Sequence, residues 1–391
     1  MKTQFDQPTD RRGTGCVKWD APVAAGAAED FIPIWVADMD FPTAPAVRRA
    51  VEDRAAQGIF GYTFIGDSYY EAIVSWFRRR HGWNIDRSDI IYIPSVVPAI
   101  SCVAQAMTMP GEQVLVLSPV YNCFFSSVRN SGCQVLECPL LYVDNRYEVD
   151  WEAFEACCAQ EKTTLFLLCN PHNPAGRLWT AEELLRMNDI CLRHGVKVIS
   201  DEIHCELVMP GCHFTPFATV SPECRDNAIV LNSPSKAFNT AGLMIANIIC
   251  HNDEWRRRIN RYISISELNN MSPFGPVGLI AAYNEGEEWL DELCVYIKGN
   301  YDFMRDFLAA ECPEVGVTRL EATYLAWLDV RTLTGSVDSL AARLLDEAHV
   351  KVCPGTMYGP RTGEGFLRVN LATQRDRLAE ALRRMAPFLR K

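Results

Sequence analysis

Continuously apolar runs, each long enough for one buried strand, recur along the middle of the chain. The clearest are QVLVLS (113–118), TTLFLLC (163–169), VKVISD (196–201) and AIVLNS (228–233). Because they do not alternate apolar and polar residues, they are typical of strands covered on both faces. Helical patterns follow at 121–130 and 180–195, and Thr180 with Glu183 three residues later is a typical helix start. This succession predicts an α/β domain with helices flanking a mostly parallel sheet.

The pattern changes near residue 285, where long helices and isolated strands replace the regular succession. The segments read as a helix at 287–311, a strand at 324–330, a helix at 336–349, a strand at 366–372 and a terminal helix. They predict a second, smaller α+β domain. We expect a large domain at 45–288, and a small domain formed by 1–44 together with 289–391.

Charge and cysteine content exclude several classes of protein. A net charge of −11 argues against nucleic-acid and anionic-membrane partners. No apolar run approaches the roughly 20 residues of a membrane span, and the polar first residues show no apolar leader. The 16 cysteines form no CxxC pair, so we expect buried free thiols in a reducing cytoplasm and no metal site.

Polar side chains follow three of the apolar runs at their carboxyl ends, where ligands bind in an open parallel sheet. They are Asn170 and Asn173 in NPHNPAG, Asp201 and His204 in DEIH, and Ser233, Ser235 and Lys236 in SPSK. Each one alone has an ordinary explanation as a turn residue, a helix cap or a solvated lysine. Together, an amine, a carboxylate, amides and hydroxyls at neighbouring strand ends predict a cofactor site.

Pyridoxal phosphate is the cofactor that needs this set of groups. Its aldehyde bonds a lysine amine, and its ring withdraws electrons while a buried carboxylate keeps the ring nitrogen protonated. Its phosphate needs hydroxyls and the free N–H groups of a helix N-terminus. A nucleotide-binding dehydrogenase is excluded, because no GxGxxG follows a strand and no GxxxxGK[ST] occurs.

A series of longer motifs then runs through nearly the whole chain. They are DRRGTGCVKWD, WVADMDF, GYT, VVPAIS, SPVYNCFF, NPHNPAGR, SDEIH, PSKAFNTAGL, ATYLAWLD and GFLRVNLA. In this order they resemble the fold-type I pyridoxal-phosphate enzymes of the class I/II aminotransferase superfamily. Within that superfamily the chain resembles the branch of PatB- and MalY-type cystathionine β-lyases, which includes cystalysin.

The resemblance implies a role for each residue around the cofactor ring. Lys236 matches the lysine bonded to the aldehyde, and Asp201 matches the carboxylate facing the ring nitrogen. Asn173 and His204 match the residues near the ring oxygen. Tyr121 matches the aromatic residue stacked on the ring.

The resemblance also implies how the phosphate is bound. Val96 and Val97 match the helix start whose backbone N–H groups hold it, and Ser233 and Ser235 match nearby hydroxyls. Tyr62 matches a tyrosine that reaches the phosphate of the partner subunit, which implies a homodimer.

For the substrate, the resemblance assigns the α-carboxylate to Arg368, whose guanidinium fork suits a bidentate contact. The backbone at Ala37 and Asp38 is the implied second contact.

Three positions depart from the family pattern. Ser95 stands where relatives often have glycine, and Asn122 where cystalysin-like members have a second tyrosine. Met244 stands where many aminotransferases have a phosphate-binding arginine.

The implied reaction is α,β-elimination on an L-amino acid with a sulfur leaving group, such as cystathionine or cysteine, giving pyruvate, ammonia and a thiol. Transamination uses the same lysine, aspartate and asparagine, and no sequence feature separates the two. A regulatory role through binding another protein, which one member of the family has, is a further alternative.

Overall fold

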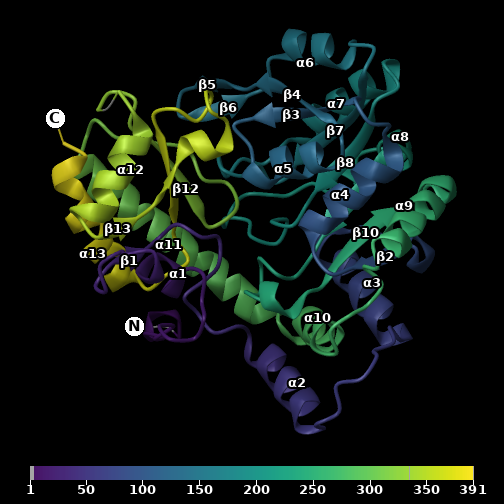
Figure 1. Ribbon diagram of the computed structural model, residues 1–391, viewed down its shortest axis with the longest axis horizontal. Coiled ribbons are helices and arrows are strands. Elements are labelled where there is room, and N and C mark those ends of the chain that lie inside the picture. The colour runs from purple at the N-terminus through teal and green to yellow at the C-terminus, as the bar shows by residue number, and fades with distance from the viewer. Residues whose placement is uncertain (1–3, 334, 391) are drawn as a thin grey trace.

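The computed structural model describes residues 4–333 and 335–390. Within these residues the largest sheet has seven strands in the order β2-β10-β9-β8-β7-β3-β4 (Figure 1). The strands are β2 (Ile90–Ile93), β3 (Gln113–Ser118), β4 (Gln134–Pro139), β7 (Thr163–Cys169), β8 (Lys197–Asp201), β9 (Ala228–Asn232) and β10 (Ala246–Cys250). Only β10 of this sheet runs against its neighbours. The predicted α/β fold with a mostly parallel sheet is therefore confirmed.

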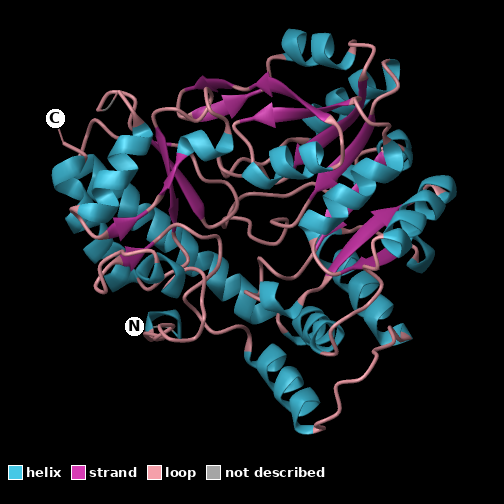
Figure 2. Ribbon diagram, viewed as in Figure 1, coloured by secondary structure: helices cyan, strands magenta, loops and turns pink. Residues whose placement is uncertain are grey.

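Helices cover both faces of this sheet (Figure 2). They are α3 (Asp67–His81), α4 (Val96–Met107), α5 (Asn122–Asn130), α6 (Trp151–Cys158), α7 (Ala181–Arg193), α8 (Pro222–Asp226), α9 (Asp253–Ile265) and α10 (Phe274–Glu285), while α2 (Pro45–Ala56) packs on α10 away from the sheet (Figure 1). On β3, Val114 and Val116 belong to one apolar core, while Leu115 and Leu117 belong to the other. Continuous apolar strands are explained by this burial on both faces.

Local signals in the sequence place individual helices correctly. Thr180 caps α7 in a full capping box, in which its side chain accepts from Glu183 N and the Glu183 side chain accepts from Thr180 N. The short hairpin of β5 (Leu141–Val143) and β6 (Arg146–Glu148) lies outside the main sheet.

A smaller layer is built on an antiparallel sheet. Its strands, in the order β11-β12-β15-β14, are β11 (Gly316–Val317), β12 (Leu325–Asp329), β15 (Phe366–Asn370) and β14 (Cys353–Pro354). The helices of this part are α11 (Glu287–Glu311), α12 (Val337–Asp346) and α13 (Arg375–Met385). The predicted α+β character of this region is confirmed.

The N-terminal residues lie on the C-terminal part of the chain. Strand β1 (Ile32–Pro33) pairs in parallel with β13 (Val350–Lys351), and α1 (Asp20–Ala24) precedes it. Short 3-10 helices lie at Gln4–Asp6, Arg87–Asp89, Phe217–Thr219, Ala241–Leu243, Gly355–Tyr358 and Ala386–Phe388. The division into 45–288 on one side and 1–44 with 289–391 on the other stays a prediction.

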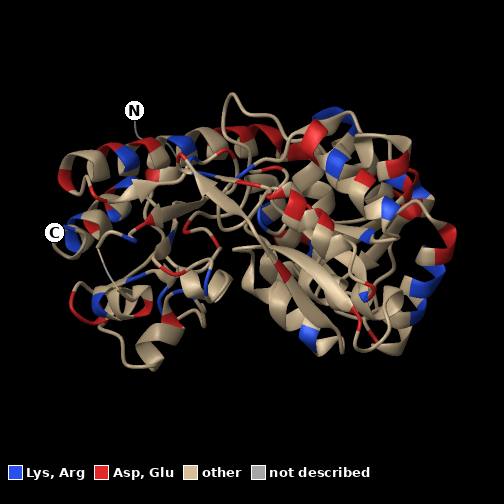
Figure 3. Ribbon diagram, turned by 90° about the horizontal axis from the view of Figure 1, so that it is seen from above, with Lys and Arg blue, Asp and Glu red and all other residues tan. Residues whose placement is uncertain are grey.

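The charged residues and the cysteines are spread over the whole described structure. Acidic and basic residues are intermixed along the outer helices (Figure 3). Among the described helices, none combines the length and the apolar character needed to cross a membrane. All 16 cysteines lie in the described part of the chain, and each is a free thiol.

Candidate active site

The polar residues that follow β7, β8 and β9 meet at one edge of the sheet, because these strands are neighbours and run parallel. A cavity of about 300 Å³ opens there. Its walls include Asn173 after β7, Asp201 and His204 at and after β8, and Ser235 and Lys236 after β9. The structure therefore brings together the amine, the carboxylate and the amide that the sequence singles out.

One wall of the cavity is the start of helix α4. Val96 and Val97 are its first two residues, and both line the cavity. Pro98 follows without an N–H, and the N-cap residue Ser95 makes no side-chain capping bond. The N–H groups of this first turn, together with the positive end of the helix dipole, suit an anion at this end of the cavity.

Another wall comes from the smaller sheet. Arg368 on β15 is buried, and its guanidinium group lies 4.6 Å from the centre of the Tyr358 ring. Its Nη1 donates to Asn173 Oδ1 at 3.2 Å, and its Nη2 donates to the Trp35 carbonyl at 3.0 Å. Arg368 therefore joins the small sheet, the segment before α2 and the turn after β7 around one cavity.

Lys236 lies at the centre of this arrangement. Its Nζ donates to the Ala37 carbonyl at 2.7 Å, and the Tyr324 hydroxyl donates to the same oxygen at 3.0 Å. Burial, together with the nearby charge of Arg368, lowers the pKa of Lys236 from 10.5 to about 8. A substantial fraction of this amine is therefore neutral, and nucleophilic, near neutral pH.

This pKa predicts the labelling of Lys236 in ligand-free protein. Only the neutral amine reacts with an acylating reagent, so labelling should rise about tenfold per pH unit and level off above about 8. Mass spectrometry of the peptide that contains Lys236 measures this, with the exposed Lys162 as an internal reference for reagent loss. A profile that still rises steeply above pH 9.5 would contradict the prediction.

Burial also shifts the two other titratable groups at the strand ends. It raises the pKa of Asp201 to about 7, against the opposing effects of the Ile203 N–H and the charge of Lys236. It lowers the pKa of His204 to about 3, with the charges of Lys236 and Arg368 acting in the same direction. His204 is therefore neutral, and its Nδ1 is buried without a partner in the described structure. Asp201 lacks a full positive partner, so a bound cation facing it would restore its charge.

Tyr121 also lines the cavity, immediately before α5. Its ring meets Phe124 edge-on, with the ring centroids 6.0 Å apart. Asn122 and Cys123 line the same side. These residues form an aromatic and polar wall between β3 and the small sheet.

Three residues singled out by the sequence lie elsewhere or are engaged otherwise. The family resemblance places Ser233 beside a phosphate, but its hydroxyl donates to the Ile245 carbonyl at 2.6 Å, and Ser233 is absent from the described cavity wall. Tyr62 is fully exposed, between α2 and α3. The Asp38 N–H donates to the Val36 carbonyl at 2.9 Å. By contrast, the Ala37 N–H has no acceptor among the described residues, and Ala37 lines the cavity.

Sequence reasoning missed part of the site. Trp35, Cys353 and Tyr358 line the cavity, and Tyr324 donates to the Ala37 carbonyl. Tyr324 lies within the quoted motif ATYLAWLD, so that motif was the available signal. Cys353 and Tyr358 lie in no motif we single out, and only the tertiary structure places them here.

Two groups of potential metal ligands lie away from the cavity, and each already contains an arginine. Glu206, near His81 and Cys205, lies 3.7 Å from Arg80. Asp89, near Asp86 and His251, lies 2.8 Å from Arg256. These cations neutralise the carboxylates that a metal ion would need, and the absence of a metal site stays a prediction.

The family follows from comparison with known proteins. The model of the family described as aminotransferase class I and II matches residues 29–385. The chain belongs to this family.

Within the class I and II aminotransferases, the chain lies in the PatB and MalY branch. It is 40% identical to cystathionine β-lyase PatB of Bacillus subtilis, over 98% of this chain and 99% of that protein. It is 34% identical to protein MalY of Escherichia coli, over 97% of this chain and 96% of that protein. Among solved structures, cystalysin from Treponema denticola, which contains pyridoxal 5′-phosphate, superposes with a TM-score of 0.96 at 31% identity, covering 100% of this chain and 99% of that one.

The site of this class I/II aminotransferase-family chain has no arginine at its anion-binding end in the described structure. Met244 has a positive φ of 56° and a half-exposed side chain, and it is not part of the cavity wall. The charged residues that line the described cavity are Asp201, Lys236 and Arg368. The described cavity wall at the start of α4 therefore offers an anion backbone N–H groups and no arginine.

Proposed function

We propose that this chain is a pyridoxal-phosphate-dependent carbon–sulfur β-lyase that acts on L-cysteine S-conjugates such as cystathionine or cysteine. The observation that carries the proposal is the placement of Lys236 and Asp201 in one buried cavity, at the ends of neighbouring strands. The relatives named as cystathionine β-lyases and cystalysin support it, because they match over nearly the whole chain.

The residues of the cavity fit this cofactor. The neutral fraction of the Lys236 amine suits the aldehyde, and a protonated ring nitrogen supplies the cation that buried Asp201 lacks. The unbonded N–H groups at the start of α4 suit the phosphate, and the Ser235 hydroxyl in the same cavity is a further candidate donor. Asn173 and neutral His204 suit the ring oxygen, and Tyr121 suits the ring face.

The chemistry divides between the cofactor and the chain. When bound, pyridoxal phosphate supplies an aldehyde for the substrate amine and a ring that withdraws electrons from the α-carbon. Arg368 and the free Ala37 N–H bind the substrate carboxylate and so orient the α C–H bond toward Lys236. Lys236, as a free amine, takes the α-proton. The bond from the β-carbon to sulfur then breaks, thiolate leaves, and the released three-carbon fragment hydrolyses to pyruvate and ammonia.

Pyruvate formation tests the function. Purified protein with pyridoxal phosphate should form pyruvate and thiol from cystathionine, cysteine or another S-conjugate without any keto acid. A coupled lactate dehydrogenase assay measures the pyruvate. Strict dependence on an added keto acid, with amino-group transfer to it, would instead assign the chain to the transaminases. The regulatory alternative stays open, and a pull-down comparing wild type with Lys236→Ala separates it from catalysis.

We further infer a homodimer with the site at the subunit interface. The segment between α2 and α3 exposes Ile59, Phe60, Tyr62 and Phe64, and such apolar exposure is typical of a protein interface. In Figure 1 this segment extends away from the body of the protein. The proposal gives Tyr62 of the partner subunit the phosphate contact that Met244 cannot make.

This arrangement predicts complementation between variants. Tyr62→Ala should weaken cofactor affinity about tenfold, as expected for one lost hydrogen bond to a charged group. A hybrid of one Tyr62→Ala subunit and one Lys236→Ala subunit should have one active site with wild-type cofactor affinity, because that site combines intact Lys236 with intact Tyr62. Ultracentrifugation and activity of purified hybrids measure this. Hybrids whose active site keeps the tenfold weaker cofactor affinity would place Tyr62 and Lys236 of the same subunit in one site.

A cytoplasmic location is proposed as well. All 16 cysteines are free thiols, which suits a reducing compartment.

A further inference from the structure

The segment 35–41, which precedes α2, has no helix or strand and is held by side chains from distant parts of the chain. Each of its carbonyls accepts a side-chain hydrogen bond. The donors are Arg368 for Trp35, Asn370 for Val36 and Asp38, Lys236 and Tyr324 for Ala37, Asn239 for Met39 and Phe41, and Gln374 for Asp40. A backbone satisfied in this way has its position set by those side chains.

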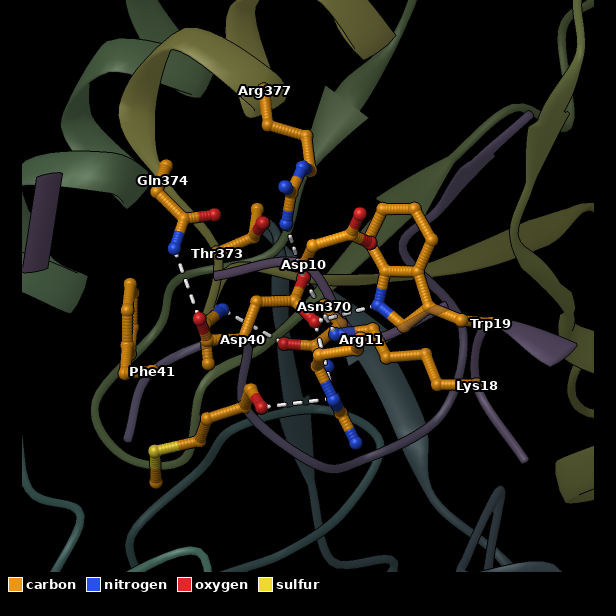
Figure 4. Close-up of polar contacts among 12 residues, drawn as sticks. Asp10, Arg11, Lys18, Trp19, Asp40, Phe41, Asn370, Thr373, Gln374 and Arg377 are labelled. Atoms are coloured by element: carbon orange, nitrogen blue, oxygen red, sulfur yellow. Dashed lines mark hydrogen bonds and ion pairs between the residues drawn. The ribbon is translucent and has the colours of Figure 1, made fainter. Parts of the chain in front are cut away.

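Asp40 is the buried anchor of this segment (Figure 4). Its carboxylate lies 3.1 Å from Lys18 Nζ, 3.1 Å from Arg11 Nη1 and 3.3 Å from Arg377 Nη1. The Trp19 indole N–H donates to it at 3.0 Å. The side chains of Asp40 and Lys18 are both fully buried, so this is a desolvated ion pair.

The groups around Asp40 keep its carboxyl group ionised. Burial opposes ionisation, but Lys18, the Trp19 indole and Arg377 together lower its pKa to about 2. Lys18 also donates to the Asp38 carbonyl at 3.3 Å, and Arg11 donates to the Met39 carbonyl at 3.0 Å. Two of the cations that neutralise Asp40 therefore also bond the carbonyls of the two residues before it.

The same segment holds two groups of the active site. The Ala37 carbonyl accepts from Lys236, and the Trp35 carbonyl accepts from Arg368. These oxygens are two residues apart, so a shift of this backbone moves both acceptors together. We propose that Asp40, fixed by Lys18, Arg11 and Arg377, is a positioning residue that sets the Trp35 and Ala37 carbonyls and through them the Lys236 amine and the Arg368 guanidinium group.

The catalytic roles of Lys236 and Arg368 rest on the function proposed above. The contacts that connect Asp40 to these two groups do not depend on that function. It predicts that Asp40→Asn affects the two groups in defined ways, whereas a purely stabilising role predicts only a lower melting temperature. Asp30→Asn is the matched control. Asp30 also bridges the N-terminal residues to α13, through Arg384 at 3.3 Å, but it is exposed and bonds no residue of 35–41.

The first measurement uses ligand-free protein and needs no reaction. A hydrogen bond to Ala37 favours the charged form of Lys236, so Asp40→Asn should lower the pH midpoint of Lys236 labelling. The variant replaces none of the other groups that act on this amine, which are Arg368 from β15, Asp201 from β8, Cys123 from α5 and Asp38 beside Ala37. Asp30→Asn should label as wild type does.

The second measurement reads the position of Arg368 in the holoenzyme. L-Alanine and ethylamine are compared as inhibitors, because they differ in the carboxylate that Arg368 would bind. Asp40→Asn should reduce the preference for L-alanine about tenfold, the scale of one weakened hydrogen bond between charged groups. Asp30→Asn should leave this preference unchanged.

Lys18→Gln provides a second test if the Asp40→Asn protein does not fold. It leaves Asp40 paired with Arg11 and Arg377, so the carboxylate is not left unpaired, and it should shift both readouts in the same direction by less. Wild-type labelling and inhibitor preference in a folded Asp40→Asn or Lys18→Gln protein would overturn the proposal. If the wild type forms no pyruvate, the proposed function fails while the labelling comparison still decides the positioning role.

Discussion

Replacing Lys236 by alanine is expected to lower kcat about 10⁴-fold, because one amine has two roles in the proposed reaction. It bonds the cofactor before substrate arrives, and it takes the α-proton afterwards. The visible absorption that the bound cofactor shows in wild type should change with the loss of its link to the chain. Burial of Lys236 and its pKa near 8 support both roles, since each needs a neutral amine.

Two comparisons separate loss of chemistry from loss of structure. Lys236→Arg keeps a positive charge near the Ala37 carbonyl but cannot act as a neutral base, so it should be as inactive as the alanine variant. Added methylamine should restore part of the activity of Lys236→Ala, because a small amine fits the space that the side chain leaves. Turnover within tenfold of wild type in Lys236→Ala would refute the assignment of this lysine.

Arg368→Lys is expected to lower kcat/KM about 10²-fold, or about 3 kcal/mol, mainly through a higher KM. The guanidinium group is buried and already fixed by Asn173 and the Trp35 carbonyl, which leaves it preorganised for a carboxylate. A lysine keeps the charge but loses the planar fork, so a bidentate contact cannot form. Steady-state kinetics with an S-conjugate of cysteine measure the change.

Arg319→Lys is a suitable control for this variant. Arg319 lies between β11 and β12 of the same small sheet, but it is 67% exposed and its charged partner is Glu321. Its replacement should leave KM within twofold, as is usual for a surface ion pair. If Arg368→Lys weakens L-alanine and ethylamine equally as inhibitors, Arg368 does not bind the carboxylate.

The sequence predicts the strand ends well, for a physical reason. Asn173, Asp201 and Lys236 follow apolar runs that are covered on both faces, and parallel strands present their carboxyl ends at one edge. The sequence does not reveal that β10 reverses direction. ANIIC is as apolar as its neighbours, and only the irregular connection from 233 to 245, without a crossover helix, permits an antiparallel return.

The remaining parts of the site depend on contacts between distant segments. Ser233 has the residue type for a phosphate contact, but its hydroxyl is used by the Ile245 carbonyl, which no local pattern indicates. Tyr324 and Asn370 bond carbonyls of the segment 35–41, and these pairs are far apart in sequence. Motif reading finds such residues only when they fall inside a motif and does not give their partners.

The way the segment 35–41 is fastened has a consequence for the order in which the chain matures. Gln374, which bonds the Asp40 carbonyl, is synthesised 334 positions after it. Asn370 and Arg368 also emerge late from the ribosome. We therefore expect a nascent chain to complete its large sheet first and to acquire a working catalytic centre only after residue 374 has been synthesised. Chains stalled before residue 368 would contain Lys236 but lack Arg368 and Asn370. Such chains are expected to have no lyase activity.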